Sequence, residues 1–257
     1  MLEINKIIQG ECSAVMKTFP DNCIDMTCTS PPYDNLRQYC GYTFDFEAIA
    51  RQLYRVTKKG GVVVWVVGDA TVNGSETGTS FRQALYFMEC GFNLHDTMIY
   101  QKDGFSFPES NRCHNVFEYM FVFSKGKPKI FNVLRDRINK NPGVKLTGTD
   151  RQVNGKFKPI SGYGKILDKL GGRFNIWKIP NQTKDTKHPA PFPEQLANDH
   201  IISWSNKGDL ILDPFCGSGT VPKMAIENHR DYIGIEISEE YIDIINKRIL
   251  TAQPQLF

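Results

Sequence analysis

Thr29-Ser30-Pro31-Pro32-Tyr33 follows an apolar run, residues 24–28, that has the composition of a buried strand. Consecutive prolines cannot donate to a sheet ladder and disfavour a helix, so they end the strand at the edge where open α/β sheets bind ligands. Alone, such a segment is most simply a proline-rich turn. At a ligand-binding edge, however, the Ser30 hydroxyl and the Pro31 carbonyl can accept amino hydrogens while the Tyr33 ring stacks on a flat heterocycle. We therefore predict that Ser30, Pro31, Pro32 and Tyr33 are catalytic.

A second motif lies near the other end of the chain, where Asp213-Pro214-Phe215-Cys216-Gly217-Ser218-Gly219-Thr220 joins an apolar strand to a helix. Glycines in such a turn let a ligand approach the backbone at the helix N-terminus. The stretch contains neither a G-x-x-x-x-G-K phosphate loop nor the dinucleotide spacing. The next strand ends in Glu236, whose carboxylate can hold both hydroxyls of a ribose. The region can therefore bind a ribose but has no phosphate-binding motif, and Asp213 is available for an ammonium group. This combination indicates a binding site for S-adenosylmethionine, which we favour over the interpretation as a purely structural glycine turn.

Strands and helices alternate at both ends of the chain, which predicts one α/β sheet, mostly parallel, with helices on both faces. The helix that begins at Asp45 is expected to end in Lys58-Lys59-Gly60-Gly61, since basic residues and glycine favour a helix C-terminus. The segments 68–79 and 103–114 are expected to be loops. The predicted strands are 4–9, 24–28, 62–67, 94–101, 116–124, 209–213 and 232–237, and the other predicted helices are 13–19, 80–90, 193–205, 220–227 and 238–250.

Charge is distributed unevenly along the chain. Residues 127–185 contain 14 Lys or Arg and 4 Asp, a net charge of +10, whereas the remaining residues carry 17 basic and 24 acidic side chains, a net charge of −7. A basic segment within an otherwise acidic protein indicates contact with a polyanion. We therefore divide the chain into a first half of the sheet (1–126), a basic insertion that binds nucleic acid (127–185) and a second half of the same sheet (186–257).

The seven cysteines include no C-x-x-C pair. We therefore expect no metal site and no disulfide framework, and we interpret most cysteines as packing residues in a reducing cytoplasm. No apolar run reaches the length of a membrane span, and the N-terminal sequence lacks signal-peptide character. The sequence thus predicts a cytoplasmic protein without a membrane partner.

Together, D-P-F-C-G-S-G-T and T-S-P-P-Y resemble the motifs of S-adenosylmethionine-dependent DNA amino-methyltransferases, which modify the exocyclic nitrogen of cytosine or adenine. The motif order, with the catalytic segment first, resembles their circularly permuted β group, and the match covers nearly all of the chain outside 127–185. The resemblance implies a Rossmann-like class I methyltransferase fold with an inserted DNA-recognition region. It also implies double-stranded DNA as substrate and a bacterial or phage protein associated with the nucleoid, and it allows a homodimer and a cognate restriction enzyme.

Three shorter segments extend the resemblance. Residues 187–193, K-H-P-A-P-F-P, resemble the segment that packs against the methionine end of the cofactor, and 117–125 resemble the last strand of the catalytic half. Gly10-Glu11-Cys12 falls where the group usually has G-D-C, so Glu11 replaces an aspartate. The cofactor-binding residues implied by the resemblance are Glu11, Thr29, Asp213, Pro214, Phe215, Gly217, Ser218, Gly219, Thr220, Glu236, Ile237, Lys187, His188 and Phe192.

Methylation of a base in a duplex requires that the base be flipped out. Arg37 and Tyr39 in a predicted loop at 34–44, or Phe105, Phe107 and Arg112 in the loop at 103–114, are candidates to fill the gap. Each of them taken singly is interpreted more readily as an ordinary loop residue than as a DNA contact. The other predicted DNA contacts are Lys156, Lys158 and Arg173.

Ser30 favours N4 of cytosine over N6 of adenine, because its hydroxyl can accept from the amino group or donate to the adjacent ring nitrogen. Adenine offers a similar ring nitrogen, so N6-adenine is the first alternative. Methylation at cytosine carbon 5 is disfavoured, since no Pro-Cys nucleophile occurs at the catalytic strand end. More distant alternatives are a methyltransferase acting on RNA or on protein glutamine, and a catalytically inactive DNA-binding regulator.

Overall fold

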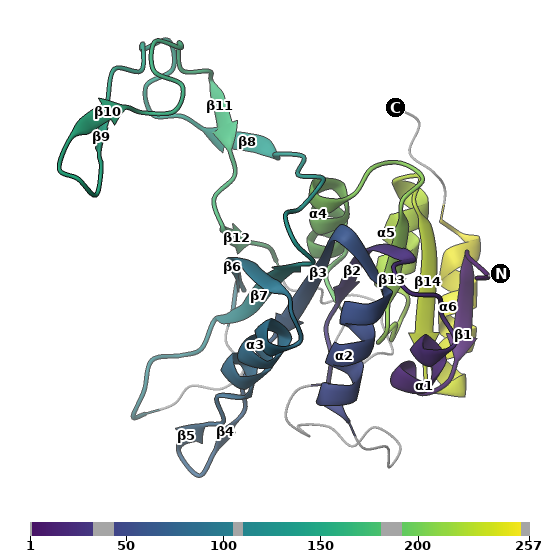
Figure 1. The fold of residues 1–257 in the computed structure, drawn as a ribbon. Coiled ribbons are helices and arrows are strands. Elements are labelled where there is room, and N and C mark those ends of the chain that lie inside the picture. Colours follow the sequence, from purple (N-terminus) through teal and green to yellow (C-terminus); the bar gives the residue numbers. More distant parts are fainter. Residues whose placement is uncertain (1, 33–43, 105–109, 181–191, 253–257) are drawn as a thin grey trace. The chain divides into compact units, whose positions relative to one another are not determined.

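An eight-stranded sheet organises the larger of two structural units, residues 1–132 with 175–257 (Figure 1). A computed structural model of the chain describes residues 2–32, 44–104, 110–180 and 192–252. In spatial order the strands are β1 (Lys6–Gln9), β14 (Asp231–Glu236), β13 (Leu210–Asp213), β2 (Ile24–Thr29), β3 (Thr57–Val67), β7 (Phe117–Ser124), β6 (Asn93–Gln101) and β12 (Ile176–Lys178).

Five of the seven neighbouring strand pairs are parallel, and β7 is antiparallel to both β3 and β6. The two ends of the chain interleave, since β13 lies between β14 and β2, with Ile211 opposite Met26 and Leu212 opposite Thr27. Because β1, β14, β13, β2 and β3 all run in one direction, their carboxyl ends lie along one edge of the sheet. The predicted mostly parallel α/β sheet is confirmed.

Helices cover both faces of the sheet. The buried side chains of α1 (Cys12–Lys17), α2 (Phe46–Val56) and α3 (Thr79–Glu89) belong to one apolar cluster, whereas α4 (Glu194–Trp204), α5 (Thr220–Glu227) and α6 (Glu239–Leu250) pack on the other side (Figure 1). Within the described ranges, no helix combines the length and apolar character needed to cross a membrane.

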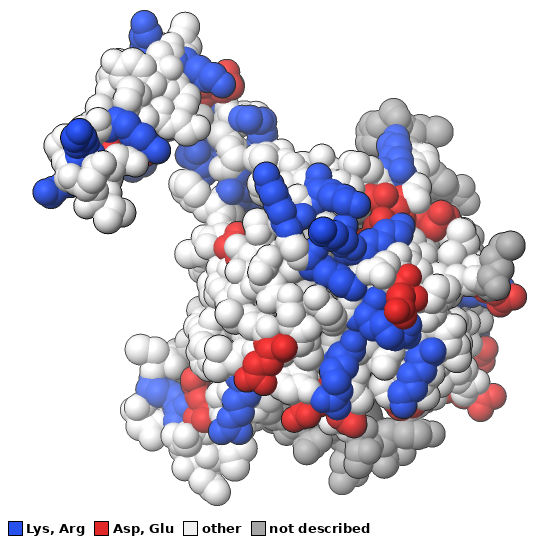
Figure 2. All heavy atoms as spheres, viewed as in Figure 1, with Lys and Arg blue, Asp and Glu red and all other residues white. Residues whose placement is uncertain are grey.

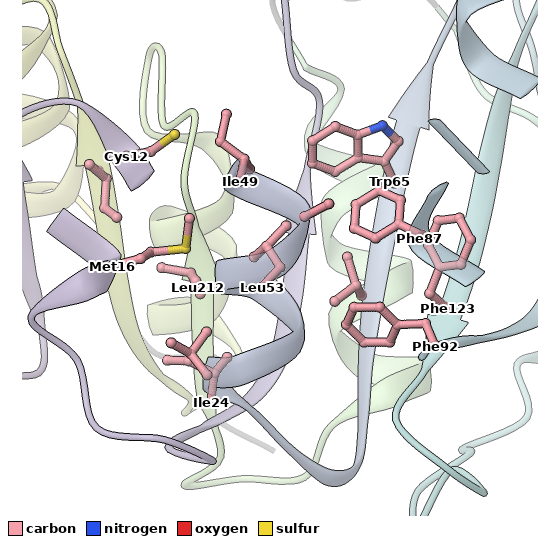
Figure 3. Close-up of a cluster of buried hydrophobic side chains, with 14 of the residues drawn as sticks. Cys12, Met16, Ile24, Ile49, Leu53, Trp65, Phe87, Phe92, Phe123 and Leu212 are labelled. Carbon is pink, nitrogen blue, oxygen red and sulfur yellow. The ribbon is translucent and has the colours of Figure 1, made fainter. Parts of the chain in front are cut away.

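The apolar cluster in Figure 3 lies between the first three helices and the sheet. Phe87 of α3 stacks on Phe123 of β7 with ring centroids 4.5 Å apart. Trp65 of β3 is fully buried, and its indole N–H donates to Gln83 Oε1 at 2.9 Å, which satisfies its one polar atom inside the core. This packing covers one face of β2 and β3. The first motif begins at Thr29, the last residue of β2.

The junction between α2 and β3 differs from the prediction. The helix ends at Val56, and Thr57 already has an extended backbone, so Lys58-Lys59-Gly60-Gly61 begins β3 instead of ending α2. Long-range pairing overrides the local signal here, since the Gly60 N–H donates to the carbonyl of Lys125 at 2.7 Å and Lys58 pairs with Asp25 at 2.7 Å. The strand therefore starts five residues before the predicted Val62.

The predicted loop 68–79 contains a small hairpin, β4 (Thr71–Val72) and β5 (Ser75–Glu76). Asp69 accepts hydrogen bonds from the backbone N–H and the hydroxyl of Ser80, at 2.8 and 2.6 Å, and so joins the end of β3 to the first turn of α3.

The second unit, residues 133–174, lies within the predicted basic insertion but is shorter than it. Beyond it, β12 pairs with β6 and belongs to the large sheet. The unit consists of two antiparallel pairs, β8 (Arg135–Ile138) with β11 (Leu170–Gly172) and β9 (Thr149–Arg151) with β10 (Phe157–Pro159). All of its residues are described, and only Asn139 and Gly171 are buried. It contains ten Lys or Arg against three Asp, and Figure 2 shows basic side chains on its visible face.

Candidate active site

The strands β2, β13 and β14 bring the two sequence motifs to one edge of the sheet. Thr29 is the last residue of β2, Asp213 the last of β13 and Glu236 the last of β14. The hydroxyl of Thr29 donates to Asp213 Oδ1 at 2.7 Å, and both side chains are buried. A direct contact thus joins the predicted catalytic segment to the predicted cofactor loop.

Asp213 is a buried carboxyl group that accepts two hydrogen bonds, from Thr29 and, at 3.1 Å, from the backbone N–H of Phe215. Burial raises the pKa of Asp213 to about 7, the two hydrogen bonds act in the opposite direction, and the charge of Glu236 adds to the increase. Among the described residues, no basic side chain forms an ion pair with Asp213 or Glu236. A bound cation would therefore be stabilised here by charge that the protein itself leaves uncompensated.

Glu236 closes the neighbouring strand and is held by three backbone N–H groups. Gly217 donates to Oε2 at 2.7 Å, while Ile237 and Ser238 donate to Oε1 at 3.0 and 2.9 Å. Burial raises the pKa of Glu236, and these hydrogen bonds oppose the shift. A carboxylate has about four acceptor positions, so one, on Oε2, is left for a ligand hydroxyl.

The loop between β13 and α5 needs its glycines. Gly217 and Gly219 have φ values of 52° and 80°, in the left-handed region that glycine tolerates best. A Cβ at Gly219 would also lie 2.9 Å from a methyl group of Ile245. The backbone therefore turns tightly against α6 before it enters α5.

Two charged residues that the sequence analysis missed hold this loop. Arg248 donates to the carbonyl and the hydroxyl of Ser218 at 3.1 and 2.9 Å, and Glu194 accepts from Arg248 at 2.6 Å and from Lys223 at 2.7 Å. No local motif signals these contacts, because they join residues from three different helices.

The remaining described residues of the predicted cofactor set lie around the same loop. Pro214 is buried, and the Phe215 ring packs against Trp65 at 6.1 Å between centroids. Thr220 donates through its hydroxyl to the carbonyl of Phe192 at 3.2 Å, which ties α5 to the segment before α4.

Glu11 is occupied by the helix that follows it. Its carboxylate accepts hydrogen bonds from the N–H groups of Ser13 and Ala14, at 2.7 and 2.8 Å, and from the Ser13 hydroxyl at 2.7 Å. It therefore acts as the N-cap of α1. A contact between Glu11 and the cofactor stays a prediction.

The predicted catalytic segment is described only in part. Ser30 and Pro32 are half-buried and Pro31 is buried, directly after the Thr29 that contacts Asp213. Tyr33 lies outside the described residues, as do Arg37, Tyr39, Phe105, Phe107, Lys187 and His188.

Two of the predicted DNA contacts have partners within the chain. Arg112 donates to the Gly74 carbonyl at 2.6 Å and thereby holds the β4–β5 hairpin. Arg173 donates from Nε to Asp136 at 2.9 Å. Lys156 and Lys158, in contrast, lie on the exposed β9–β10 hairpin. A role in DNA binding stays a prediction for all four residues.

The thiols near the site are unsuited to nucleophilic attack. Cys28 on β2 and Cys216 in the glycine loop are both buried, and burial, together with the charge of Asp213, raises the pKa of each thiol well above its ordinary value. Both therefore remain protonated at neutral pH, whereas methylation at cytosine carbon 5 needs a thiolate.

Comparisons with known proteins agree with this arrangement. The family model of the N6/N4 methyltransferases, described as DNA methylase, matches residues 24–247. The orphan methyltransferase M.BamHII of Bacillus amyloliquefaciens is 60% identical over 238 residues, which cover 89% of each chain.

Solved structures confirm the fold. The PvuII DNA methyltransferase, named as cytosine-N4-specific, aligns with a TM-score of 0.71 and 19% identity over 99% of this chain and 89% of its own. A putative DNA modification methylase from Thermus thermophilus, solved in complex with S-adenosyl-L-methionine, aligns with a TM-score of 0.66 and 22% identity over 97% and 96%. The predicted Rossmann-like class I fold is confirmed, and the chain belongs to the N6/N4 family of DNA methylases.

Proposed function

We propose that this DNA methyltransferase transfers the methyl group of S-adenosylmethionine to an exocyclic amino group of a base in duplex DNA, with N4 of cytosine as the target. The observation that carries the proposal is the buried Thr29–Asp213 hydrogen bond, which joins the end of β2, directly before Ser30, to the end of β13, directly before the glycine loop. It supports a site in which an amino-bearing base and a cationic cofactor are bound side by side. N6 of adenine is the alternative within the same family.

S-adenosylmethionine supplies an electrophilic methyl group, and its positive charge fits the buried carboxyl groups of Asp213 and Glu236. Asp213 would face the cationic methionine end, the backbone at Gly217 and Gly219 would allow close approach, and the free acceptor position of Glu236 would take a ribose hydroxyl. Two buried carboxyl groups without a basic partner among the described residues support a positively charged ligand.

The base would be held by the first motif. An aromatic amino group is a weak nucleophile because its lone pair is delocalised into the ring. When Ser30 and the Pro31 carbonyl accept its two hydrogens, the nitrogen becomes pyramidal and its lone pair is directed toward the methyl group. Tyr33 would stack on the flipped base. Orientation of this kind is the main source of acceleration that such a site offers.

The hydroxyl of Ser30 supports cytosine, because it can donate to N3, the basic ring nitrogen next to the amino carbon, whereas a carboxylate could only accept. The cytosine-N4-specific name of a protein with the same fold agrees with this choice. A homodimer and a cognate restriction enzyme stay predictions, and the 60% identical relative carries the name orphan methyltransferase.

Transfer of a labelled methyl group from the cofactor to four purified acceptors tests the proposal. We expect incorporation into duplex DNA, and no comparable incorporation into structured RNA of matched sequence or into a protein with accessible glutamines. The fourth acceptor is single-stranded DNA, in which the target base need not be flipped out of a duplex. Comparison of its labelling rate with that of duplex DNA separates base flipping from methyl transfer. Equal or greater labelling of RNA or protein would contradict the proposal, and DNA binding without transfer to any acceptor would support the inactive regulator.

The affinity for the cofactor should depend on pH through Asp213. Its pKa of about 7 in the free protein means that the carboxyl group is largely protonated at pH 5.5, and a cation binds the ionised form better. Binding must then expel a proton, so we expect the affinity to fall by up to about tenfold per pH unit below pH 7. Calorimetry between pH 5.5 and 7.5, in buffers of different ionisation enthalpy, measures both affinity and proton release.

Asp213→Asn is the matched control for this dependence. Its amide oxygen can still accept from Thr29 and Phe215, but the group no longer titrates. The variant should bind the cofactor more weakly at pH 7.5 and with little pH dependence. An affinity of the unmodified protein that stays constant from pH 5.5 to 7.5 would rule out a role for Asp213 in cation binding.

A further inference from the structure

The β9–β10 hairpin of the small unit forms without support from an apolar core. Arg151 lies opposite Phe157, and Asp150 opposite Lys158. The turn closes through backbone bonds from Gln152 N–H to the Lys156 carbonyl at 2.7 Å and from Gly155 N–H to the Gln152 carbonyl at 2.9 Å, with Gly155 at φ 78°. The hairpin therefore has a defined register set by its own backbone.

Neither face of this hairpin is covered. Every residue of both strands is exposed, including Phe157 at 68%, and Val153 at the tip is fully exposed. An isolated two-stranded hairpin is marginally stable in water, and no other element of the small unit covers this one. The hairpin is thus better suited to binding a partner than to packing within the protein.

The side chains of the hairpin are left available for that partner. Within the described residues, Arg151, Gln152, Lys156 and Lys158 form no side-chain hydrogen bond or ion pair. Other arginines of the same unit are engaged, such as Arg137, which donates to the Gly172 carbonyl at 2.9 Å and lies over the Phe174 ring. The hairpin consequently carries three unpaired cations and one free amide against a single acidic residue, Asp150.

A two-stranded β-ribbon fits the major groove of B-DNA, which is about 12 Å wide and presents a distinct donor and acceptor pattern for every base pair, whereas the pattern in the minor groove is largely degenerate. In that groove arginine pairs with the O6 and N7 atoms of guanine, glutamine pairs with adenine, and apolar side chains contact the thymine methyl group. Because Arg151 and Phe157 are cross-strand partners, their side chains project from the same face of the ribbon and can reach base edges together.

We infer that the hairpin 149–159 enters the major groove of the substrate duplex, where Arg151 reads a guanine and Lys156 and Lys158 contact phosphates. The inference rests on the proposed function and extends it to the residues that set sequence specificity. The partner class follows from charge, from the unpaired guanidinium and amide donors, and from the ribbon geometry.

Arg151→Lys tests this assignment most sharply, because it keeps the charge but loses the bidentate fork. The methylated sequence is first mapped with the unmodified protein on a randomised duplex library. In Arg151→Lys, discrimination at one G·C position should relax by roughly 5- to 150-fold, with the other positions and the salt dependence unchanged. Lys165→Ala, which removes a charge from the same unit outside the hairpin, should leave every position intact.

The double variant Lys156→Ala, Lys158→Ala tests the two proposed phosphate contacts. Its affinity should fall on all sequences alike, and the slope of log affinity against log salt should decrease in magnitude by roughly 0.9 for each phosphate that the variant no longer neutralises. The sequence preference should be retained.

Replacement of guanine by 7-deazaguanine tests the groove without any variant, since it removes the N7 acceptor from the major groove alone. One guanine of the mapped site should become sensitive, and the sensitivity should disappear in Arg151→Ala. If no guanine is sensitive, or if the Arg151 variants discriminate as well as the unmodified protein, the inference is overturned while the proposed function stands. A protein that transfers no methyl group to any DNA would instead overturn the proposed function.

Discussion

Ser30→Ala should reduce the rate of methyl transfer to DNA by roughly 10²-fold or more, while the affinity for S-adenosylmethionine changes little. The variant loses the hydroxyl that would hold one amino hydrogen of the base, and misplacement of a reacting group by about 1 Å can cost a factor of that size. Ser30 lies one residue beyond Thr29, the residue that contacts Asp213, so the cofactor loop itself is left intact. Single-turnover kinetics and calorimetry separate the two effects.

Ser75→Ala provides the matched control for this experiment, because it removes the hydroxyl of an exposed serine on the β4–β5 hairpin. Its transfer rate should equal that of the unmodified protein. A transfer rate for Ser30→Ala within about threefold of the unmodified value would show that the serine does not position the base.

Glu236→Ala should weaken cofactor binding by roughly 10- to 150-fold, the equivalent of about 1.5–3 kcal/mol for a hydrogen bond to a charged group. The substitution removes the acceptor offered to the ribose and also releases the N–H groups of Gly217, Ile237 and Ser238. We therefore expect a lower melting temperature as well, which a thermal melt of the cofactor-free protein measures.

Two control variants separate these contributions. Glu236→Gln keeps acceptor oxygen for part of the backbone contacts without the charge, and it should lose less stability and less affinity than Glu236→Ala. Glu239→Ala removes a carboxylate from an exposed position in the first turn of α6 and should not alter cofactor binding. Unchanged cofactor affinity in Glu236→Ala would refute the assignment of the ribose to this residue.

The parts of the fold that the sequence predicted well carry strong local signals. The double proline at Pro31-Pro32 and the glycine loop after Asp213 each give a strong local signal for the end of a strand, and the predicted bounds of β2 and β13 agree with the structure to within one residue. The order of the two motifs predicted a permuted sheet, which the adjacency of β2 and β13 and the family match confirm.

The errors and omissions have a common physical cause, since each depends on residues distant in the chain. Lys58-Lys59-Gly60-Gly61 has the composition of a helix end, yet the strand segment near Lys125 recruits it into β3. The contact of Arg248 with Ser218 is likewise invisible to local patterns. Segment 127–185 was defined by its charge, and charge cannot reveal that Ile176–Lys178 extends the large sheet beside β6.

The candidate active site likewise combines features that the local sequence predicts with features that depend on long-range packing. Residue types and spacing identified Asp213 and Glu236 as candidates, but their burial and the absence of a basic partner among the described residues emerge only from the packing of β13 against β2 and β14. Glu11 has a role that the motif does not reveal, because its carboxylate caps α1, and its contact with the cofactor stays a prediction.

Nucleoside mass spectrometry of DNA treated with the protein and isotopically labelled S-adenosylmethionine tests the central claim most directly, because it identifies the atom that receives the methyl group. We predict labelled N4-methyl-2′-deoxycytidine. Labelled N6-methyl-2′-deoxyadenosine in its place would contradict the choice of base and leave amino-group methylation standing. Labelled 5-methyl-2′-deoxycytidine, or no labelled nucleoside at all, would contradict the account itself.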